Sequence, residues 1–384
     1  VGGIVGAANL ASEVTGNTVQ GTTVTADMTA EYSEDKPADI GSVVGWKHAD
    51  AVVKDNTPVS GPNTANVNAV TLFVKVKDGN DINKYSDFAV VIPEGEYTFT
   101  EDVKSQSIQV REGEVEITAG KIETGNANQY GFVAEGENTS LVINDANIDS
   151  KGGGIGANSG AQVTFKNGKL AVNSASTSGR YLFYVVGEGT VVTIDGGEFS
   201  FSSTLNQKRA YVYTGAGAKV IINDGTFGKA STRSGYTDGI LGDGETIIYG
   251  GTFGFNPTRW VAAGCTIKKD GANWVVTKGD PATTSEELKD SIDKMEEGET
   301  VVVAEGNYGR FPTFDKNVTI YCEEGTVFQG NSKLNIKGST VVGATFSNPG
   351  GTAVDQTING TFKNCTFTGS NALRYCYAGE NVVF

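Results

Sequence analysis

Short runs in which apolar and polar residues alternate recur through most of the chain, and Gly, Asn and Asp residues separate them. Alternation with a period of two is typical of β-strands that have one buried face. One longer pattern also repeats: apolar, any, apolar, two turn-type residues, Gly, any, apolar. Its copies begin at Val115, Leu141, Val163, Val192, Val220 and Thr246, and later at Ser339 and Gly360.

Within these two series, consecutive copies begin 21 to 29 residues apart. That length suits a leucine-rich repeat or one coil of a β-solenoid. The leucine-rich pattern is absent, and no helical periodicity separates the copies. We therefore predict an all-β fold, a right-handed parallel β-helix, because parallel crossover connections are almost always right-handed. Equivalent residues of successive coils would then stack about 4.8 Å apart.

The pattern also predicts which positions form the core and which form the corners. The third positions should be buried and in register: Ile117, Ile143, Phe165, Ile194, Ile222 and Ile248. Asn and Asp tolerate left-handed backbone and hydrogen-bond their own turns. We therefore expect the corners at Asn144, Asp145, Asn167, Asp195, Asn223 and Asp224. A second strand precedes the pattern, as in "YVYTG" from Tyr211.

Two β-helix modules are indicated, because "VIPEGEY" from Val91 matches "VVAEGNY" from Val302. The first module is predicted over 66–279, as one parallel β-helix from about Ala69 to Thr277. The second is predicted over 284–384. The junction is expected in the segment that contains "KKDGANW" and "KGDP".

A short capping α-helix is predicted at the start of the second module. Leu288, Ile292 and Met295 share one helical face, and Thr284 or Ser285 can act as the N-cap. Such a helix can cover the open end of a solenoid, since terminal repeats need covers.

The first 65 residues follow a different repeat. "GGIVGAANLASEVTGNTVQG" from Gly2 aligns with "GSVVGWKHADAVVKDNTPVS" from Gly41, an offset of 39. We therefore predict a separate two-copy segment over 1–65. The chain starts on "VGGIVG" and stops on "VVF" from Val382, inside a further copy of the solenoid pattern. We expect truncation in mid-coil, with the remainder of a larger polypeptide at both ends.

These stretches resemble known families. The "GGIVG" and "GSVVG" units are similar to the GLUG motif of large bacterial surface proteins. "EELKDSI…GETVVVAEGNY" and "FKNCTF" resemble pectate-lyase-like right-handed β-helices. "NPTRWVAAGCTIKKDGANWVV" from Asn256 resembles a segment of β-helix surface proteins of gut-type bacteria and of some phage appendage proteins. The resemblance covers nearly the whole chain and implies architecture, but that superfold hosts lyases, hydrolases, tailspikes and adhesins alike.

Composition and charge narrow the function. The chain has 384 residues, 38% of them apolar, which is enough for a core, and its 52 glycines lack the period of collagen. The formal net charge of −15, without a basic tract, argues against nucleic acid as a partner. No run approaches 18 apolar residues, so we expect no membrane span in this segment.

The sequence gives little support for a catalytic or metal-binding role. The one histidine, His48, cannot supply a histidine-based metal site or a Ser-His triad. Asp195 and Asp224 are the best pair for glycoside hydrolysis, yet Asn occupies equivalent corners, which favours a turn role. Asp78 and Asp81 in "KDGNDINK" lack the glutamate of an EF-hand, which favours a solvated loop. We predict no catalytic residue, no metal and no cofactor, and expect a chelator not to destabilise the first module.

The four cysteines, Cys265, Cys322, Cys365 and Cys376, form no CxxC pair. Without a histidine partner they are poor candidates for nucleophilic catalysis. We interpret them as packed small side chains. A disulfide stays open as the alternative in an oxidising compartment, with a pairing that sequence alone cannot assign.

Basic residues recur just before the aromatic strand of successive coils. The candidate ligand-binding residues are Arg180, Tyr181, Arg209, Tyr211, Arg233 and Tyr236, and Arg374 and Tyr375 repeat the pattern later. Stacked coils would form a ladder of Arg, which binds carboxylates bidentately, and of Tyr, whose face can stack on sugars. The alternative is that the Tyr residues belong to the core and Arg solvates a corner.

The sequence thus favours a non-catalytic β-solenoid of a secreted, extracellular or cell-surface protein, acting as a stalk or adhesin. The expected partner is a polysaccharide or a host or cell-surface glycan. One alternative is a carbohydrate-active enzyme, such as a polysaccharide lyase or hydrolase or a phage tailspike depolymerase. Another is a structural spacer in a virion appendage or surface layer. An enzyme needs carboxylate and basic residues clustered on one strand face, and no such set is evident in the sequence.

Overall fold

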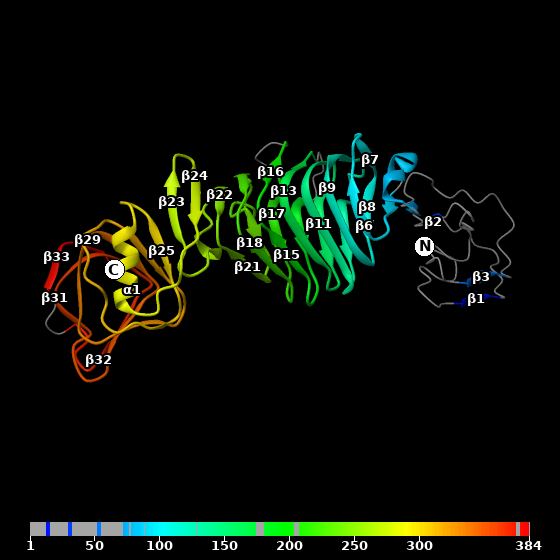
Figure 1. Cartoon of the computed structure of the whole chain (residues 1–384). Coiled ribbons are helices and arrows are strands. Elements are labelled where there is room, and N and C mark those ends of the chain that lie inside the picture. The colour runs from blue at the N-terminus through cyan, green and yellow to red at the C-terminus, as the bar shows by residue number, and fades with distance from the viewer. Residues whose placement is uncertain are drawn as a thin grey trace.

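Parallel strands stack in successive coils along the chain (Figure 1). The computed structural model describes residues 13–15, 30–32, 52–54, 72–76, 78–87, 89–127, 129–173, 180–202, 207–373 and 377–383. Strand pairs from coil to coil are parallel in both halves of the chain. The predicted all-β parallel solenoid is therefore confirmed. His48, Arg374, Tyr375 and Cys376 lie outside the described residues.

One side of the first stack is a nine-stranded parallel sheet, called here the front sheet. Its strands in order are β2 (Ala30–Tyr32), β4 (Leu72–Lys75), β5 (Ala89–Val91), β8 (Ser107–Val110), β10 (Tyr130–Glu135), β12 (Gly153–Asn158), β14 (Arg180–Val185), β17 (Arg209–Thr214) and β20 (Ile240–Leu241). Because β2 pairs with β4, the sheet reaches into the segment that we expected to be separate. In that segment β1 (Glu13–Thr15) also pairs with β3 (Val52–Lys54), at an offset of 39 residues.

The repeated pattern forms the rest of each coil, called here the corner sheet. Its strands in the first stack are β6 (Gly95–Thr98), β7 (Val103–Ser105), β9 (Gly113–Thr124), β11 (Thr139–Ser150), β13 (Gln162–Val172), β15 (Val191–Ile194), β16 (Glu198–Phe201), β18 (Lys219–Ile222), β19 (Thr226–Lys229), β21 (Glu245–Ile248) and β22 (Gly251–Gly254). In β9, β11 and β13 one long strand passes through the corner, whereas later coils divide it into two.

The predicted core ladders are confirmed. All six third-position side chains are fully buried, and each lies opposite its counterpart in the next coil. At the eighth position, the rings of Phe199, Phe227 and Phe253 stack with centroids 4.6 and 4.9 Å apart. Stacked aromatic rings add roughly 0.5–1.5 kcal/mol per pair to the burial of their area, so this ladder ties neighbouring coils together.

The corners also lie where the pattern places them, and they need left-handed backbone. Asp145 has a φ of 65° and Gly168 a φ of 110°. A Cβ on Gly168 would lie 2.1 Å from the carbonyl oxygen of Ala146 in the previous coil, so glycine is required by close approach as well. Asn223 donates a 2.7 Å hydrogen bond to Asp195 in the neighbouring corner, so Asn and Asp side chains link the coils outside the turn.

The end of the first module differs from the prediction. Parallel coils do not continue to Thr277, because β23 (Thr266–Asp270) and β24 (Asn273–Thr277) form an antiparallel hairpin. Asp270 lies opposite Asn273 with two residues between them, and Gly271 has a φ of 58°. A two-residue connection can join only antiparallel strands, because a parallel pair needs a long crossover. The "KKDGANW" segment that marked the junction is this turn.

A second stack of coils follows the hairpin, with a hydrophobic core cluster of its own. Its elements are α1 (Ser285–Lys294), β25 (Thr300–Val303), β26 (Gly306–Asn307), β27 (Thr319–Cys322), β28 (Thr326–Gln329), β29 (Ser332–Val342), β30 (Thr345–Asn348), β31 (Val354–Lys363), β32 (Thr366–Gly369) and β33 (Tyr377–Val383). The predicted helix is confirmed, with Leu288 and Ile292 fully buried and Met295 5% exposed. Thr284 is its N-cap, in a capping box with Glu287.

Replacing Thr284 with alanine should destabilise the second stack by about 1 kcal/mol, because the variant loses the hydroxyl that accepts from the Glu287 backbone N–H at 3.2 Å. Urea unfolding followed by helical circular dichroism measures the loss. Thr284→Ser keeps the hydroxyl and is the matched control. An alanine variant as stable as the serine variant would contradict a role for the capping box.

The segment around Asp78 and Asp81 is a 3-10 helix over Gly79–Tyr85, not the solvated loop that we expected. Its Ile82 is fully buried in the core of the first stack. Asp78 caps the helix by accepting from the backbone N–H of Asn80 at 2.9 Å, and Asp81 pairs with Lys84 at 2.9 Å. The two carboxylates therefore have local structural partners.

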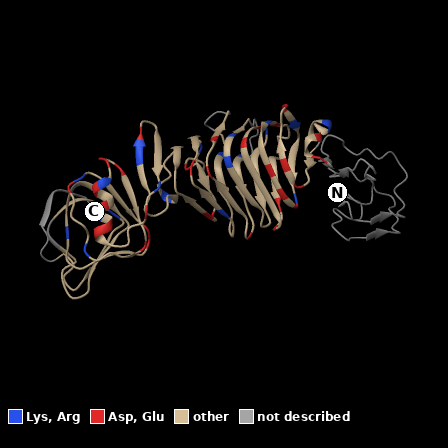
Figure 2. Cartoon of the chain, in the orientation of Figure 1, with Lys and Arg blue, Asp and Glu red and all other residues tan. Residues whose placement is uncertain are grey.

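Acidic and basic positions lie side by side on the strands of the first stack (Figure 2). Ion pairs join different coils: Lys166 to Glu116 at 2.9 Å, Lys169 to Glu198 at 2.8 Å and Lys219 to Glu245 at 3.0 Å. Stacking would otherwise bring like charges opposite each other in neighbouring strands, which is destabilising. Interleaved lysines thus let an acidic chain form in-register coils.

Candidate functional site

The structure places Arg180 and Arg209 opposite each other in β14 and β17, as a stack of coils predicts. Their surroundings differ, however. The half-buried Arg180 donates through Nη2 to the carbonyl oxygen of Ala127 at 2.6 Å. Arg209 is 3% exposed, and its guanidinium carbon lies 4.9 Å from the centre of the Phe201 ring. Burial lowers the pKa of Arg209. Of these two, therefore, only Arg180 is accessible to a ligand outside the coil.

Tyr211 lies in the core, whereas Tyr181 faces outward. Tyr211 is 2% exposed, and its ring centroid is 5.8 Å from that of Phe227. At least two consecutive residues are buried at this point of each coil, and they include Gly131 and Phe132, Gly154 and Ile155, Leu182 and Phe183, and Tyr211 and Val212. Strict alternation does not anticipate this break, which is why sequence reasoning placed Tyr211 beside Tyr181.

Arg233 and Tyr236 lie in the connection between β19 and β20. Arg233 is exposed, and its carbonyl oxygen accepts from the backbone N–H of Tyr236 at 3.0 Å. The Tyr236 side chain is hydrogen-bonded to that of Tyr181. The structure therefore brings Tyr181 and Tyr236 together, next to a strand that begins with Arg180.

A group of four half-buried tyrosines, called here the tyrosine cluster, lies on the outer face of the front sheet. Its members are Tyr130, Tyr181, Tyr184 and Tyr213. The ring centroids of Tyr130 and Tyr184 are 5.3 Å apart, and those of Tyr184 and Tyr213 are 5.1 Å apart. Tyr181 lies 5.7 Å from Tyr184 and 5.1 Å from Tyr213. Sequence reasoning missed three of the four, although Tyr184 and Tyr213 occupy equivalent positions.

Two glycines in β12 make this cluster continuous. Tyr130 and Tyr184 belong to strands that β12 separates. A Cβ on Gly153 would lie 2.3 Å from the Tyr130 ring, and one on Gly156 would lie 3.1 Å from it. The Tyr130 ring therefore leans over backbone that carries no side chain and reaches Tyr184.

Two phenols of the cluster, those of Tyr130 and Tyr181, are held in the neutral form. Burial raises the pKa of Tyr130 and of Tyr181, and neighbouring tyrosines raise both further. The hydroxyl groups of these two residues therefore stay protonated and can donate as well as accept hydrogen bonds. An amphipathic aromatic surface with one accessible guanidinium is suited to binding a sugar chain and not to acid–base chemistry.

The buried phenol of Tyr211 gives an alkaline test. Burial raises the pKa of Tyr211 to about 12, whereas an unfolded tyrosine ionises near pH 10. Its stabilising contribution is therefore complete below about pH 10 and is lost as the pH rises to about 12. Tyr211→Phe should lose less stability over that interval, by on the order of 2 kcal/mol. Urea unfolding at several alkaline pH values measures both slopes, and equal slopes would contradict the buried phenol.

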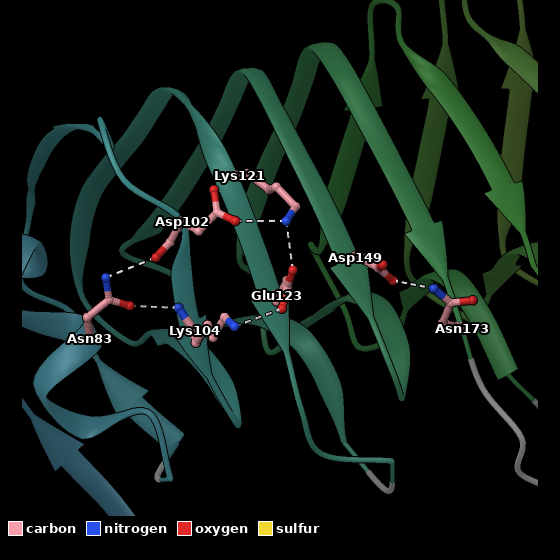
Figure 3. Close-up of polar contacts among 7 residues, drawn as sticks. All are labelled: Asn83, Asp102, Lys104, Lys121, Glu123, Asp149 and Asn173. Carbon is pink, nitrogen blue, oxygen red and sulfur yellow. Dashed lines mark hydrogen bonds and ion pairs between the residues drawn. The ribbon is translucent and has the colours of Figure 1, made fainter.

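A polar groove of about 320 Å³ runs along the corner between the two sheets of the first stack. Its lining includes Asp87, Lys104, Glu123, Asp149, Lys151 and Asn173. Figure 3 shows the contacts around it: Lys121 binds Asp102 and Glu123, both at 2.8 Å, and Asp149 accepts from Asn173 at 2.7 Å. Lys104, Glu123 and Asp149 occupy equivalent positions of three successive strands.

This groove brings together the carboxylates and lysines that the sequence did not reveal as a set. One sequence feature could have revealed the set: each of the three charged residues immediately precedes a Ser or Thr at the end of its strand, namely Ser105, Thr124 and Ser150. Hydrogen bonding to Asp102 raises the pKa of Lys121, and hydrogen bonding to Lys121 lowers that of Glu123. A general base lysine needs a lowered pKa and a general acid carboxyl a raised one. The shifts favour an ion-pair network that joins coils.

The other described residues that the sequence offered as catalytic or metal-binding candidates are buried or hydrogen-bonded within the coils. Asp224 accepts from the backbone N–H of Gly225 at 2.7 Å, inside its own corner. Cys265, Cys322 and Cys365 are free thiols, and burial raises the pKa of each. Within the described ranges, no group of three or more His, Cys, Asp or Glu residues is arranged to hold a metal ion. The same residues include no helix that is long and apolar enough to cross a membrane.

Comparisons of the chain with protein-family models, with curated proteins and with solved structures found no match.

Proposed function

We propose that this chain is a non-catalytic β-solenoid from a secreted, cell-surface protein, where it acts as a stalk or adhesin and binds glycan. The solenoid supplies a stiff support, because each coil is held to the next by backbone hydrogen bonds and by interior ladders. The resemblance to GLUG-containing and pectate-lyase-like surface proteins supports the location and the architecture. We do not infer a catalytic activity from that resemblance.

The tyrosine cluster is the observation that carries glycan binding. Four half-buried rings lie next to one another across β10, β14 and β17, beside the accessible Arg180. Of the residues predicted from sequence, we assign Arg180, Tyr181 and Tyr236 to this ligand surface, with the exposed Arg233 three residues before Tyr236 in the same connection. Arg209 and Tyr211 support it from inside the coil. Each exposed ionic contact contributes only about 0.2–1 kcal/mol, so affinity must come from several coils together.

Glycan-array binding of the wild-type chain and of Tyr184→Ala/Tyr213→Ala tests the proposal. We expect the alanine variant to lose most of the signal, while Tyr184→Phe/Tyr213→Phe retains the rings and part of the binding. Arg180→Gln should weaken the binding of acidic glycans more than that of neutral ones. The difference between wild type and this variant should shrink in salt, because exposed charges are screened over about 10 Å at 0.1 M. Equal array signals from the wild type and the alanine variant would contradict glycan binding at the tyrosine cluster and would favour the alternative of a structural spacer.

The enzymatic alternative rests on the polar groove, and its ion pairs count against it. Incubation of the chain with acidic polysaccharides, followed by an assay for new reducing ends, distinguishes the two functions. We expect no product. Product formation that Lys121→Met abolishes would favour the enzyme.

A further inference from the structure

A second groove, of about 600 Å³, lies where the two stacks meet and is called here the junction groove. One part of its lining comes from the second stack, where Thr300, Thr319 and Thr340 lie opposite one another in β25, β27 and β29. Another part comes from the hairpin β23–β24, which stands between the stacks in Figure 1, and from the preceding 3-10 helix Thr258–Trp260. A volume of this size is typical of small-molecule sites.

Aromatic residues are concentrated in the junction groove. Trp260 and Trp274 line it, and the chain has 3 tryptophans in all. Tyr321 from β27 adds a third ring, and all three side chains are half-buried. In a folded chain, large rings normally enter the core. Aromatic rings held at a groove wall supply the apolar contact area that ring-shaped ligands use.

The groove also carries positive charge in a chain whose net charge is −15. Arg259 and Lys363 line it from opposite stacks, together with the carboxylate of Asp238. Arg259 lies over the Trp260 ring at 5.7 Å, and Lys269 lies over the Trp274 ring at 5.6 Å. No carboxylate of a described residue forms a salt bridge with Arg259 or Lys363, in contrast to Lys104 and Lys121, which are ion-paired at the polar groove. Accessible cations beside aromatic rings favour an anionic ligand.

We infer that the junction groove binds a short segment of acidic glycan, separately from the tyrosine cluster. The rings of Trp260, Trp274 and Tyr321 provide stacking surfaces, Arg259 and Lys363 attract carboxylates, and the threonine row supplies hydroxyl partners for sugar hydroxyls. This inference rests on the proposed function for the class of ligand, a glycan, but it concerns a different site from the tyrosine cluster. Because the lining comes from both stacks, the bound glycan also favours one arrangement of the stacks.

Titration calorimetry of the full chain with a hyaluronan tetrasaccharide, and with neutral chitotetraose for comparison, tests this site. We expect the acidic probe to bind more tightly and its affinity to fall with salt. Trp260→Ala should weaken binding roughly tenfold, which corresponds to about 1.4 kcal/mol. Arg259→Gln/Lys363→Gln changes accessible side chains and should remove the preference for the acidic probe. Binding should also shift the tryptophan fluorescence.

Trp274→Phe keeps a ring in the hairpin and serves as the variant that should fold normally while binding more weakly. Tyr184→Ala/Tyr213→Ala should bind the tetrasaccharide at the junction like wild type. If that variant loses binding while Trp260→Ala and Arg259→Gln/Lys363→Gln retain it, the junction site is wrong and the tyrosine cluster stands. If the wild-type chain does not bind the hyaluronan tetrasaccharide, the junction site is also wrong. The proposed function is tested separately, by the glycan array with the tyrosine variants.

Discussion

Replacing Phe227 with alanine is expected to lower the free energy of unfolding of the first stack by about 3–5 kcal/mol. The side chain is 1% exposed, and its ring stacks between those of Phe199 and Phe253. The variant loses the buried area of the ring and leaves a cavity that two in-register neighbours cannot fill, because the coil spacing is fixed by backbone hydrogen bonds.

Amide hydrogen exchange with peptide resolution measures this loss, because a chain with two stacks need not unfold in one step. Exchange should accelerate in β16, β19 and β22, while the strands of the second stack serve as the internal reference. Phe367→Ala removes a half-buried ring from a later ladder and should cost clearly less. A loss below about 1 kcal/mol for Phe227→Ala would contradict the ladder as the source of stability.

Gly168→Ala is expected to destabilise the first stack by about 3 kcal/mol or more. Its φ of 110° strains any L side chain, and the added Cβ would lie 2.1 Å from the carbonyl oxygen of Ala146. Gly235→Ala is the matched control, because its φ of 80° is also positive but no atom lies within 4 Å of the added Cβ. That control should cost about 1–2 kcal/mol, so the difference between the variants isolates the close approach. Equal melting temperatures for the two would show that the corner can relax.

The repeat predicted most of the architecture because period-2 strands and turn residues act locally. Ile117, Ile143 and their equivalents are buried for the same reason that they are apolar in the sequence: each lies three positions into a copy of one pattern. The helix was equally predictable, since its cap and its apolar face lie within eleven residues of each other, from Thr284 to Met295.

The surfaces were less predictable because they depend on contacts between coils. Tyr211 lies in a run of consecutive buried residues, Arg209 to Val212, while Tyr213 is half-buried on the outer face. The cluster also needs Gly153, which has no polar or aromatic signature of its own. In the polar groove, Lys104 and Glu123 came together only through strand register. Sequence spacing alone does not fix that register to one residue.

The antiparallel hairpin between the stacks has a mechanical consequence. Hydrogen bonds between coils point along the axis of a solenoid, so tension along the axis opens them one coil at a time. Strands β9 and β11 are joined over ten residue pairs, from Thr139 to Ser150, whereas β23 meets β25 at two, Thr266 with Val301 and Ile267 with Thr300. Under load, the connection between the stacks should therefore yield first, and single-molecule pulling should record a low-force extension before either stack unravels. A solenoid built in this way would bend and stretch at a defined joint, where the junction groove would open, while the tyrosine cluster within the first stack keeps its shape.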